Sequence, residues 1–195
     1  MWIPLADKTN SSRTTPRPYR SRVGTYQFAD FEESTAISTS VIRYGDVVQF
    51  DVNASTANHR IVKSSTMANA PNVVSTAFLG IAVETSTGDG SGTGLNSSGI
   101  GVNNAKTIKV CLATPGTEFL FPTKSSVVTS TVIGSRRALA YDSTQSMFYV
   151  DIANSTAGDA SVIITGVPEP GNDANNPVIA KFLSTNTARY ISAAF

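Results

Sequence analysis

The chain has 195 residues, of which 41% are hydrophobic and only 15% charged, and its formal net charge is +1. This length allows one domain, or at most two small ones, with a proper core. The near-neutral balance excludes a strongly basic nucleic-acid binder and a disordered polyelectrolyte. Serine, threonine and asparagine replace charged groups; threonine fits a pleated strand, whereas serine and asparagine fit turns. The composition therefore predicts an all-β protein.

The sequence lacks the residues that disulfides, structural metals and membranes require. Cys111 is the single cysteine and His59 the single histidine, so neither an internal disulfide nor a structural zinc site can form. No stretch approaches the roughly 18 apolar residues of a membrane helix, and the N-terminus has no signal-peptide pattern. We therefore expect a protein made in a reducing cytoplasm, with no cofactor or metal, and with neither membrane nor nucleic acid as partner.

The first 22 residues differ from the rest. They carry five cations against one acid, Asp7, so this segment has a charge of +4 and the remainder −3. Prolines at positions 4, 16 and 18 favour extended backbone. We predict an extended arm over residues 1–40, before a β-barrel domain at 41–195; a disordered tail or an added first strand is the alternative. The side chains expected to dock on a neighbouring subunit or a larger surface are Trp2, Ile3, Arg13, Arg17, Tyr19, Arg20 and Arg22.

From residue 41 onward, short β-rich runs alternate with turn signals, and no run has convincing helical periodicity. About ten strands at such spacing are typical of a sandwich or a closed barrel. The predicted strands are Val41–Tyr44, Val47–Val52, Arg60–Ser64, Ala77–Glu84, Thr107–Thr114, Glu118–Phe121, Ala138–Tyr141, Met147–Ile152, Ser161–Val167, Val178–Leu183 and Arg189–Ser192.

Two segments, about 45–114 and 136–185, resemble each other in pattern. Val47–Asp51 matches Ala138–Asp142, because each ends in an aromatic residue and an acid. The further matches are Arg60–Lys63 with Phe148–Asp151, Ala77–Glu84 with Val162–Glu169, and Ile108–Thr114 with Ile179–Thr185. We interpret them as two similar four-stranded meanders that close on a shared core as a β-barrel or β-sandwich, which removes exposed sheet edges.

Long loops occupy equivalent places in the two segments. Gly88–Gly101 contains six glycines, and Pro168–Pro177 lies at the matching position of the second segment. Matching long loops at one end of a barrel indicate either a contact face or two solvated tips.

No constellation of catalytic residues stands out. The glycine-rich loop has no phosphate-binding pattern and precedes no helix. His59 lies in a turn and no nucleophile elbow is present; Cys111 shares a strand face with Lys109, so we expect a partly exposed, structural thiol. The carboxylates formally open to glycoside hydrolysis are Glu84, Glu118, Asp51 and Asp142. Asp51 and Asp142 resemble turn residues that leave strands, and we predict that the protein is not an enzyme.

The segments Arg43–Val48, Arg60–Ser64, Phe78–Ala82 and Lys106–Val110 resemble the small β-barrel decoration (cement) proteins of tailed-bacteriophage heads. Ile133-Gly134, Ala138–Asp142 and Gly166-Val167 are similar to the second half of that family, so the resemblance covers roughly residues 41–185. The chain departs from the family in its basic arm, its enlarged glycine loop and its tail after Leu183.

The resemblance implies a structural virion protein that binds the major capsid protein on the outer surface of the head, often as a trimer, and stabilises the shell. Aromatic residues and arginine are frequent interface hot spots, so we expect residues 1–40 to clamp the capsid or the next subunit. Phe195 is a further candidate anchor. The alternative is a virion fibre or glycan-binding module for host attachment, with Tyr44, Tyr141, Phe148 and Tyr149 as possible stacking rings, although core packing of these rings is favoured.

Overall fold

The computed structural model describes residues 15–22, 24–33, 42–50, 60–63, 78–84, 107–124, 128–145, 147–168 and 176–183. This part of the chain forms β-strands and one short 3-10 helix, η2 (Ser130–Val132), which confirms the all-β prediction. Within the same residues, no helix has both the length and the hydropathy that crossing a membrane would need.

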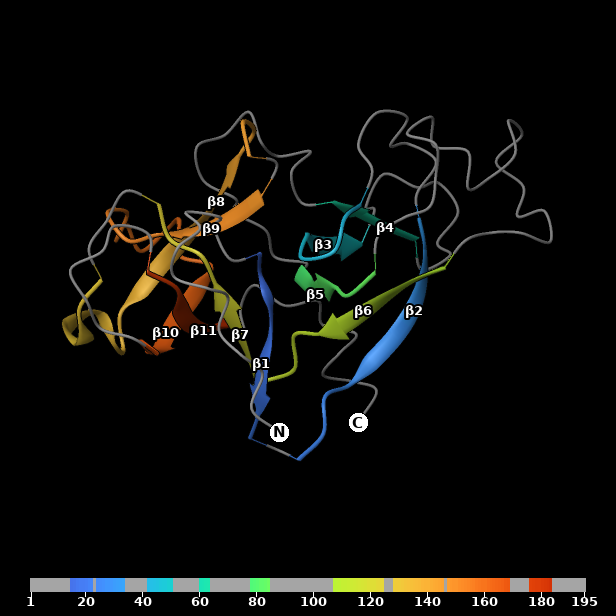
Figure 1. Ribbon diagram of the computed structural model, residues 1–195, viewed down its shortest axis with the longest axis horizontal. Coiled ribbons are helices and arrows are strands. Elements are labelled where there is room, and N and C mark those ends of the chain that lie inside the picture. The colour runs from blue at the N-terminus through green and yellow to red at the C-terminus, as the bar shows by residue number, and fades with distance from the viewer. Residues whose placement is uncertain are drawn as a thin grey trace, which may run out of the picture.

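Strands occur throughout the described part of the chain, from β1 to β11 (Figure 1). Their bounds are β1 Arg17–Ser21, β2 Phe28–Glu33, β3 Val47–Phe50, β4 Arg60–Lys63, β5 Phe78–Ala82, β6 Thr107–Leu112, β7 Thr117–Phe121, β8 Arg136–Asp142, β9 Met147–Asp151, β10 Val162–Gly166 and β11 Val178–Phe182.

Strands β2 to β6 form the first unit, in which the pairings close on themselves in the order β2-β4-β3-β5-β6. All of these pairings are antiparallel except the short parallel contact of β2 with β4, where Glu33 lies opposite Ile61. This parallel contact joins β4 to β2 and closes the five strands into a barrel.

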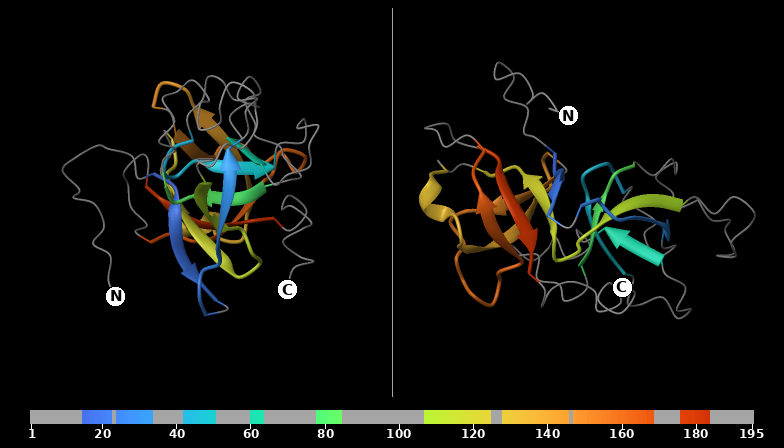
Figure 2. Two further views of the ribbon diagram at one scale, coloured as in Figure 1. Left: turned by 90° about the vertical axis from the view of Figure 1, so that its right-hand side faces the viewer. Right: turned by 90° about the horizontal axis from the view of Figure 1, so that it is seen from below.

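Strands β7 to β11 form the second unit, which belongs to an open sheet of order β1-β7-β11-β10-β8-β9. In the described residues, an isolated parallel bridge links Thr123, two residues after β7, to Val150 on β9. The chain is therefore not one closed barrel: two β units lie side by side and pack together, in a sandwich-like arrangement (Figure 2).

The two units share one strand order. Counted within each unit, the order is third, second, fourth, fifth, first. This order is β4-β3-β5-β6-β2 in the first unit and β9-β8-β10-β11-β7 in the second. The prediction of simple meanders is wrong in this respect, because β3 and β8 each pair on both edges, with β4 and β5 and with β9 and β10. The difference is that the fourth strand of each unit pairs with the free edge of the second strand instead of adding beyond the third.

Residue register is shared as well as strand order. In the first unit Val47 lies opposite Ile81, which lies opposite Cys111. In the second unit the equivalent row is formed by Arg136, Ile163 and Lys181. The sequence comparison matched Val47 with Ala138, two residues away from this register, because the aromatic-acid pairs at the strand ends dominated that match.

The same tight turn leads into the second strand of each unit. Gly45 and Gly134 have φ angles of +88° and +86°, which glycine adopts without steric cost and which suit the third position of a type II turn. The Gly45 N–H donates to the Ala82 carbonyl at 2.8 Å, and the Gly134 N–H donates to the Ile164 carbonyl at 2.8 Å. The turn therefore ties the entry of the second strand to the fourth strand in both units.

The first unit has an apolar interior of its own. Along β6, Ile108, Val110 and Leu112 point to this interior, where β3 and β5 contribute Val48 and Leu79. The opposite face of the same strands is also apolar, since Val47, Ile81 and Cys111 are fully buried there. Strands buried on both faces read as continuous hydrophobic runs, as Val47-Val48 of β3 and Phe78–Ala82 of β5 do.

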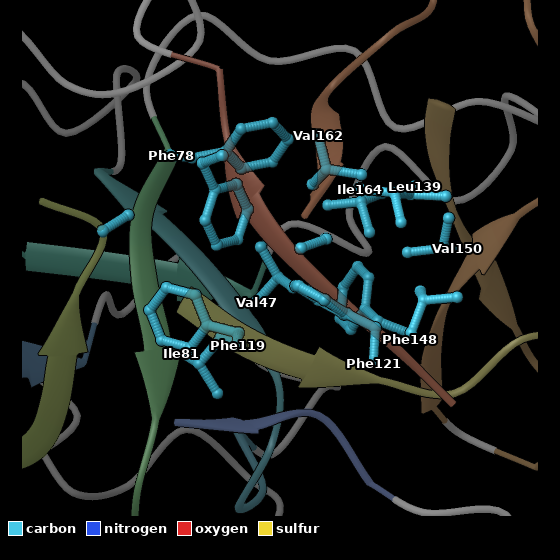
Figure 3. Close-up of a cluster of buried hydrophobic side chains, with 14 of the residues drawn as sticks. Val47, Phe78, Ile81, Phe119, Phe121, Leu139, Phe148, Val150, Val162 and Ile164 are labelled. Atoms are coloured by element: carbon cyan, nitrogen blue, oxygen red, sulfur yellow. The ribbon is translucent and has the colours of Figure 1, made fainter. Parts of the chain in front are cut away.

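The larger core lies inside the second unit and extends to the outer face of the first (Figure 3). The ring of Phe182 contacts Phe119 and Phe121 of its own unit at centroid distances of 5.5 and 5.8 Å, and Phe78 of the first unit at 5.2 Å. Each such aromatic pair adds about 0.5–1.5 kcal/mol beyond area burial. The shared core therefore fixes the two units against each other.

The N-terminal part of the chain differs most from its predicted form. Residues expected as an arm contain β1 and β2, and β1 is an added strand on the six-stranded sheet, the alternative considered above. The described residues 42–46 form a turn where Val41–Tyr44 was predicted as a strand. The predicted strand Arg189–Ser192, the loop Gly88–Gly101 and Phe195 lie outside the described residues.

Candidate docking surface

The predicted docking residues fall into two groups. Trp2, Ile3 and Arg13 lie outside the described residues. The other four lie in or directly after β1, which runs antiparallel to β7 near the junction of the two units (Figure 1); they are Arg17, Tyr19, Arg20 and Arg22.

Two of these arginines are engaged within the molecule. The side chain of Glu118 on β7 is 1% exposed, and its carboxylate accepts from the guanidinium Nε of Arg20. Arg22 donates to the other carboxylate oxygen from Nε at 3.0 Å and from a terminal nitrogen at 2.9 Å. A buried carboxylate between two arginines is strongly hydrogen-bonded, so the Glu118 clamp, formed by Glu118, Arg20 and Arg22, holds β1 to β7.

The clamp keeps Glu118 ionised. Burial by itself would raise the pKa of Glu118, but hydrogen bonds from Arg20 and Thr165, together with the charges of Arg20 and Arg22, outweigh it and lower that pKa below its ordinary value. The same hydrogen bond raises the pKa of Arg20. Glu118 is therefore held as an anion that fixes a strand, and it does not have the raised pKa that suits a general acid.

The chain before β1 contacts the first unit. Pro16 is buried, and a side-chain carbon added to Gly45 would lie 2.9 Å from the Pro16 carbonyl oxygen. Only glycine therefore allows residues 15 and 16 to pass over this turn. Through Pro16 and the Glu118 clamp, the segment that begins at Thr15 touches both units.

The β1 strand contributes little apolar burial. No residue of Arg17–Ser21 is buried, and Tyr19 is 41% exposed. The Arg20 guanidinium lies over the Tyr19 ring, 5.9 Å from its centroid, a cation–π contact. Tyr19 thus remains on the surface as an aromatic group that a partner can contact, whereas the charge of Arg20 is compensated.

A second group of cations lies on the outer face of the second unit. Arg136, Ile163 and Lys181 form a row across β8, β10 and β11, which we name the basic row. Arg136 is exposed, and Ile163 and Lys181 are half-buried. Within the described part of the chain, no carboxylate forms an ion pair with Arg136 or Lys181. Sequence reasoning missed this row because its members are far apart in the chain.

The remaining candidates for chemistry occupy separate surroundings. Cys111 is fully buried, and desolvation raises the pKa of its thiol to about 12. The expectation of partial exposure was wrong, because the strand face that carries Cys111 is covered by the core of the second unit. His59 and Asp51 lie outside the described residues.

The two other carboxylates each have local partners. Glu84 is bonded by the backbone N–H of Lys109 at 3.3 Å and lies 3.5 Å from its ammonium group. Asp142 accepts from the backbone N–H groups of Thr144 and Gln145 and pairs with Lys124 at 3.0 Å, which confirms it as a turn residue. No group of three or more histidine, cysteine or acidic side chains in the described segments has the arrangement of a metal site.

The rings considered for glycan stacking do not form a platform. Phe148 is fully buried, and Tyr141 packs on it with ring centroids 5.0 Å apart. Tyr149 is half-buried beside the ammonium group of Lys124. Tyr44 is 45% exposed at the second position of the Gly45 turn. Packing in or against the core therefore accounts for the rings of Tyr141 and Phe148.

Comparison with known proteins adds no relative. No protein-family model matches the chain, and neither a curated protein nor a solved structure gives a significant match.

Proposed function

We propose that the protein is a capsid decoration (cement) protein, a non-enzymatic virion component that binds the major capsid protein on the outside of a phage head and stabilises the shell. The proposal includes assembly as a homo-oligomer, with a trimer expected. It is supported chiefly by the anchoring of the N-terminal segment at the junction of the two units by Pro16 and the Glu118 clamp.

The argument from this anchor has two steps. Arg20 and Arg22 bind Glu118 within the molecule. The proposed contacts with the capsid are therefore made by Arg17, Tyr19 and the residues before Thr15, which include Trp2 and Ile3. A tether that starts from a fixed point loses less conformational entropy on binding than a free tail does. Many copies on one shell then multiply weak contacts through avidity.

The test is co-sedimentation of the purified protein with expanded, undecorated heads of its own virus. We compare the full chain, a chain that lacks residues 2–14, and a Trp2→Ala/Ile3→Ala variant, with Phe28→Ala as a control, since Phe28 is an exposed aromatic on the first unit. Saturable binding of the full chain and of the control, with at least tenfold weaker binding of the other two, is expected.

Equal binding by all four proteins would move the contact from the N-terminal segment to the β units. If none of the four proteins binds, the cement proposal is overturned. Retention on a glycan array would then favour the alternative of a fibre or glycan-binding module. Light scattering of the full chain measures the oligomeric state, and a monomer that persists on saturated heads would contradict the trimer.

A further inference from the structure

The equivalence of the two units assigns a role to the basic row. The three residues equivalent to it in the first unit are Val47, Ile81 and Cys111, and they form the face that packs on the core of the second unit. The same strands, at the same register, thus present a face that is an interface in one unit and lies at the surface in the other.

The side chains on these equivalent faces differ in one respect. Ile163 keeps the aliphatic side chain of Ile81 at the centre of the row, whereas Arg136 and Lys181 replace Val47 and Cys111 on either side. The outer face of the second unit therefore has an apolar centre flanked by two cations. A central apolar contact with a charged rim is the usual anatomy of a transient protein interface.

We propose that the basic row is a docking surface for an acidic protein surface, one with an apolar centre flanked by carboxylates. This inference rests on the proposed function, in which that surface belongs to the major capsid protein. Charge complementarity carries the assignment, because Arg136 and Lys181 have no ion-pair partner in the described residues and the nearby Glu118 is compensated by Arg20 and Arg22.

The composition of the row favours protein over nucleic acid as its partner. Nucleic-acid sites cluster many cations along a groove or helix face. Here two cations flank a half-buried isoleucine on a sheet, in a chain whose net charge is +1. Two cations are fewer than a nucleic-acid site uses along a run of phosphates, whereas they can pair with two carboxylates on a protein surface.

The experiment uses the full chain and the variants Arg136→Glu, Lys181→Glu and the two combined. Arg43→Glu is the matched control, because Arg43 is an exposed arginine on the Gly45 turn of the first unit and the charge change is identical. Binding is measured on expanded heads, on immobilised poly-L-glutamate and on duplex DNA, each at low and high salt. Thermal melting checks that the variants fold, which is expected since the substituted side chains lie on an outer face.

The expected result is a loss of affinity for heads of about tenfold for each single reversal, larger for both, with weaker salt dependence. Arg43→Glu should stay within about twofold of the parent chain. If the parent chain binds heads and the reversals bind equally well, the basic row is not the docking surface, although the cement proposal stands.

Two other outcomes separate the two proposals. If the parent chain does not bind heads, the cement proposal fails; retention on poly-L-glutamate that the reversals abolish would still support the basic row, and no such retention would overturn it. If the parent chain binds duplex DNA more tightly than poly-L-glutamate, and the reversals remove that binding, the assignment to an acidic protein is overturned.

Discussion

The two β units follow the same path with the same register but differ in what covers their outer faces. The row Val47–Ile81–Cys111 is fully buried against the second unit, whereas its equivalent, Arg136–Ile163–Lys181, lies at the surface. The same hydrogen-bond register is therefore compatible with apolar or charged side chains on this face. Which of them occur depends on whether another unit packs on the face. The two backbones agree because their strand pairings and turns agree, while their surfaces differ because only one of them is packed against a neighbour.

Exchange of residues between equivalent positions of the two units should have the largest effect on stability. Val47→Arg would place a charge in the shared core, where Val47 has no exposed surface, and we expect a loss of about 4 kcal/mol or failure to fold. The reciprocal change, Arg136→Val, should alter the unfolding free energy by less than about 0.5 kcal/mol, because Arg136 is exposed. Urea denaturation of both variants measures this, and equal effects would contradict the asymmetry of the two faces.

The Gly45 and Gly134 turns provide a second, smaller contrast. Alanine at either site has an unfavourable positive φ, which costs about 1 kcal/mol. At Gly45 the new side chain also meets the Pro16 carbonyl, whereas at Gly134 no atom lies within 4 Å. We therefore expect Gly45→Ala to lose about 2–3 kcal/mol in all and Gly134→Ala about 1 kcal/mol. Similar losses in thermal unfolding would show that residues 15 and 16 do not press on the first turn.

The Glu118 clamp joins β1 to β7 through charged groups, whereas Val47, Ile81 and Cys111 of the first unit pair as buried apolar residues. Glu118→Gln should cost about 1–2 kcal/mol, because the two arginines left behind are about half exposed and can be rehydrated. Hydrogen exchange should show faster opening of β1 than of β7. Equal protection of β1 in this variant and in the parent chain would mean that the backbone ladder alone holds the strand.

The same clamp predicts a pH dependence. Because the folded state lowers the pKa of Glu118 below its ordinary value of 4.5, the unfolded chain binds its proton first as the pH falls. The stabilisation is therefore fully present above about pH 5 and is lost as the pH falls through the lower, folded pKa. The difference in unfolding free energy between the parent chain and Glu118→Gln should shrink below pH 4, and a constant difference would show that the charge of Glu118 is not involved.

The shared core also shields Cys111 from reagents in solution. Burial raises the pKa of this thiol to about 12, so the thiolate is scarce at pH 8 and the sulfur is shielded. A thiol reagent should label the folded protein at least 100-fold more slowly than the urea-unfolded protein. Rapid labelling of the folded protein would show that the contact between the two units opens readily.

Much of the β structure could be predicted from the sequence. Valine- and isoleucine-rich runs bounded by glycine, asparagine and proline gave strands within a few residues of β3 to β11, because strand propensity and turn chemistry are local properties. The internal similarity also located two equivalent sets of strands. Strands β1 and β2 were missed, since Pro18 and the charged residues of Phe28–Glu33 lack the usual pattern of a strand.

Local sequence patterns are sufficient to predict the all-β class, most strand positions from β3 to β11 and the basic character of the N-terminal segment. Three further features depend on the tertiary structure: Glu118 binds Arg20 and Arg22, Cys111 is fully buried, and Arg136 and Lys181 share one row. The physical reason is that propensity and turn geometry act between near neighbours in the chain, whereas burial and ion pairing depend on pairings between distant strands. Arg20 and Glu118 are 98 positions apart, and no local pattern relates them.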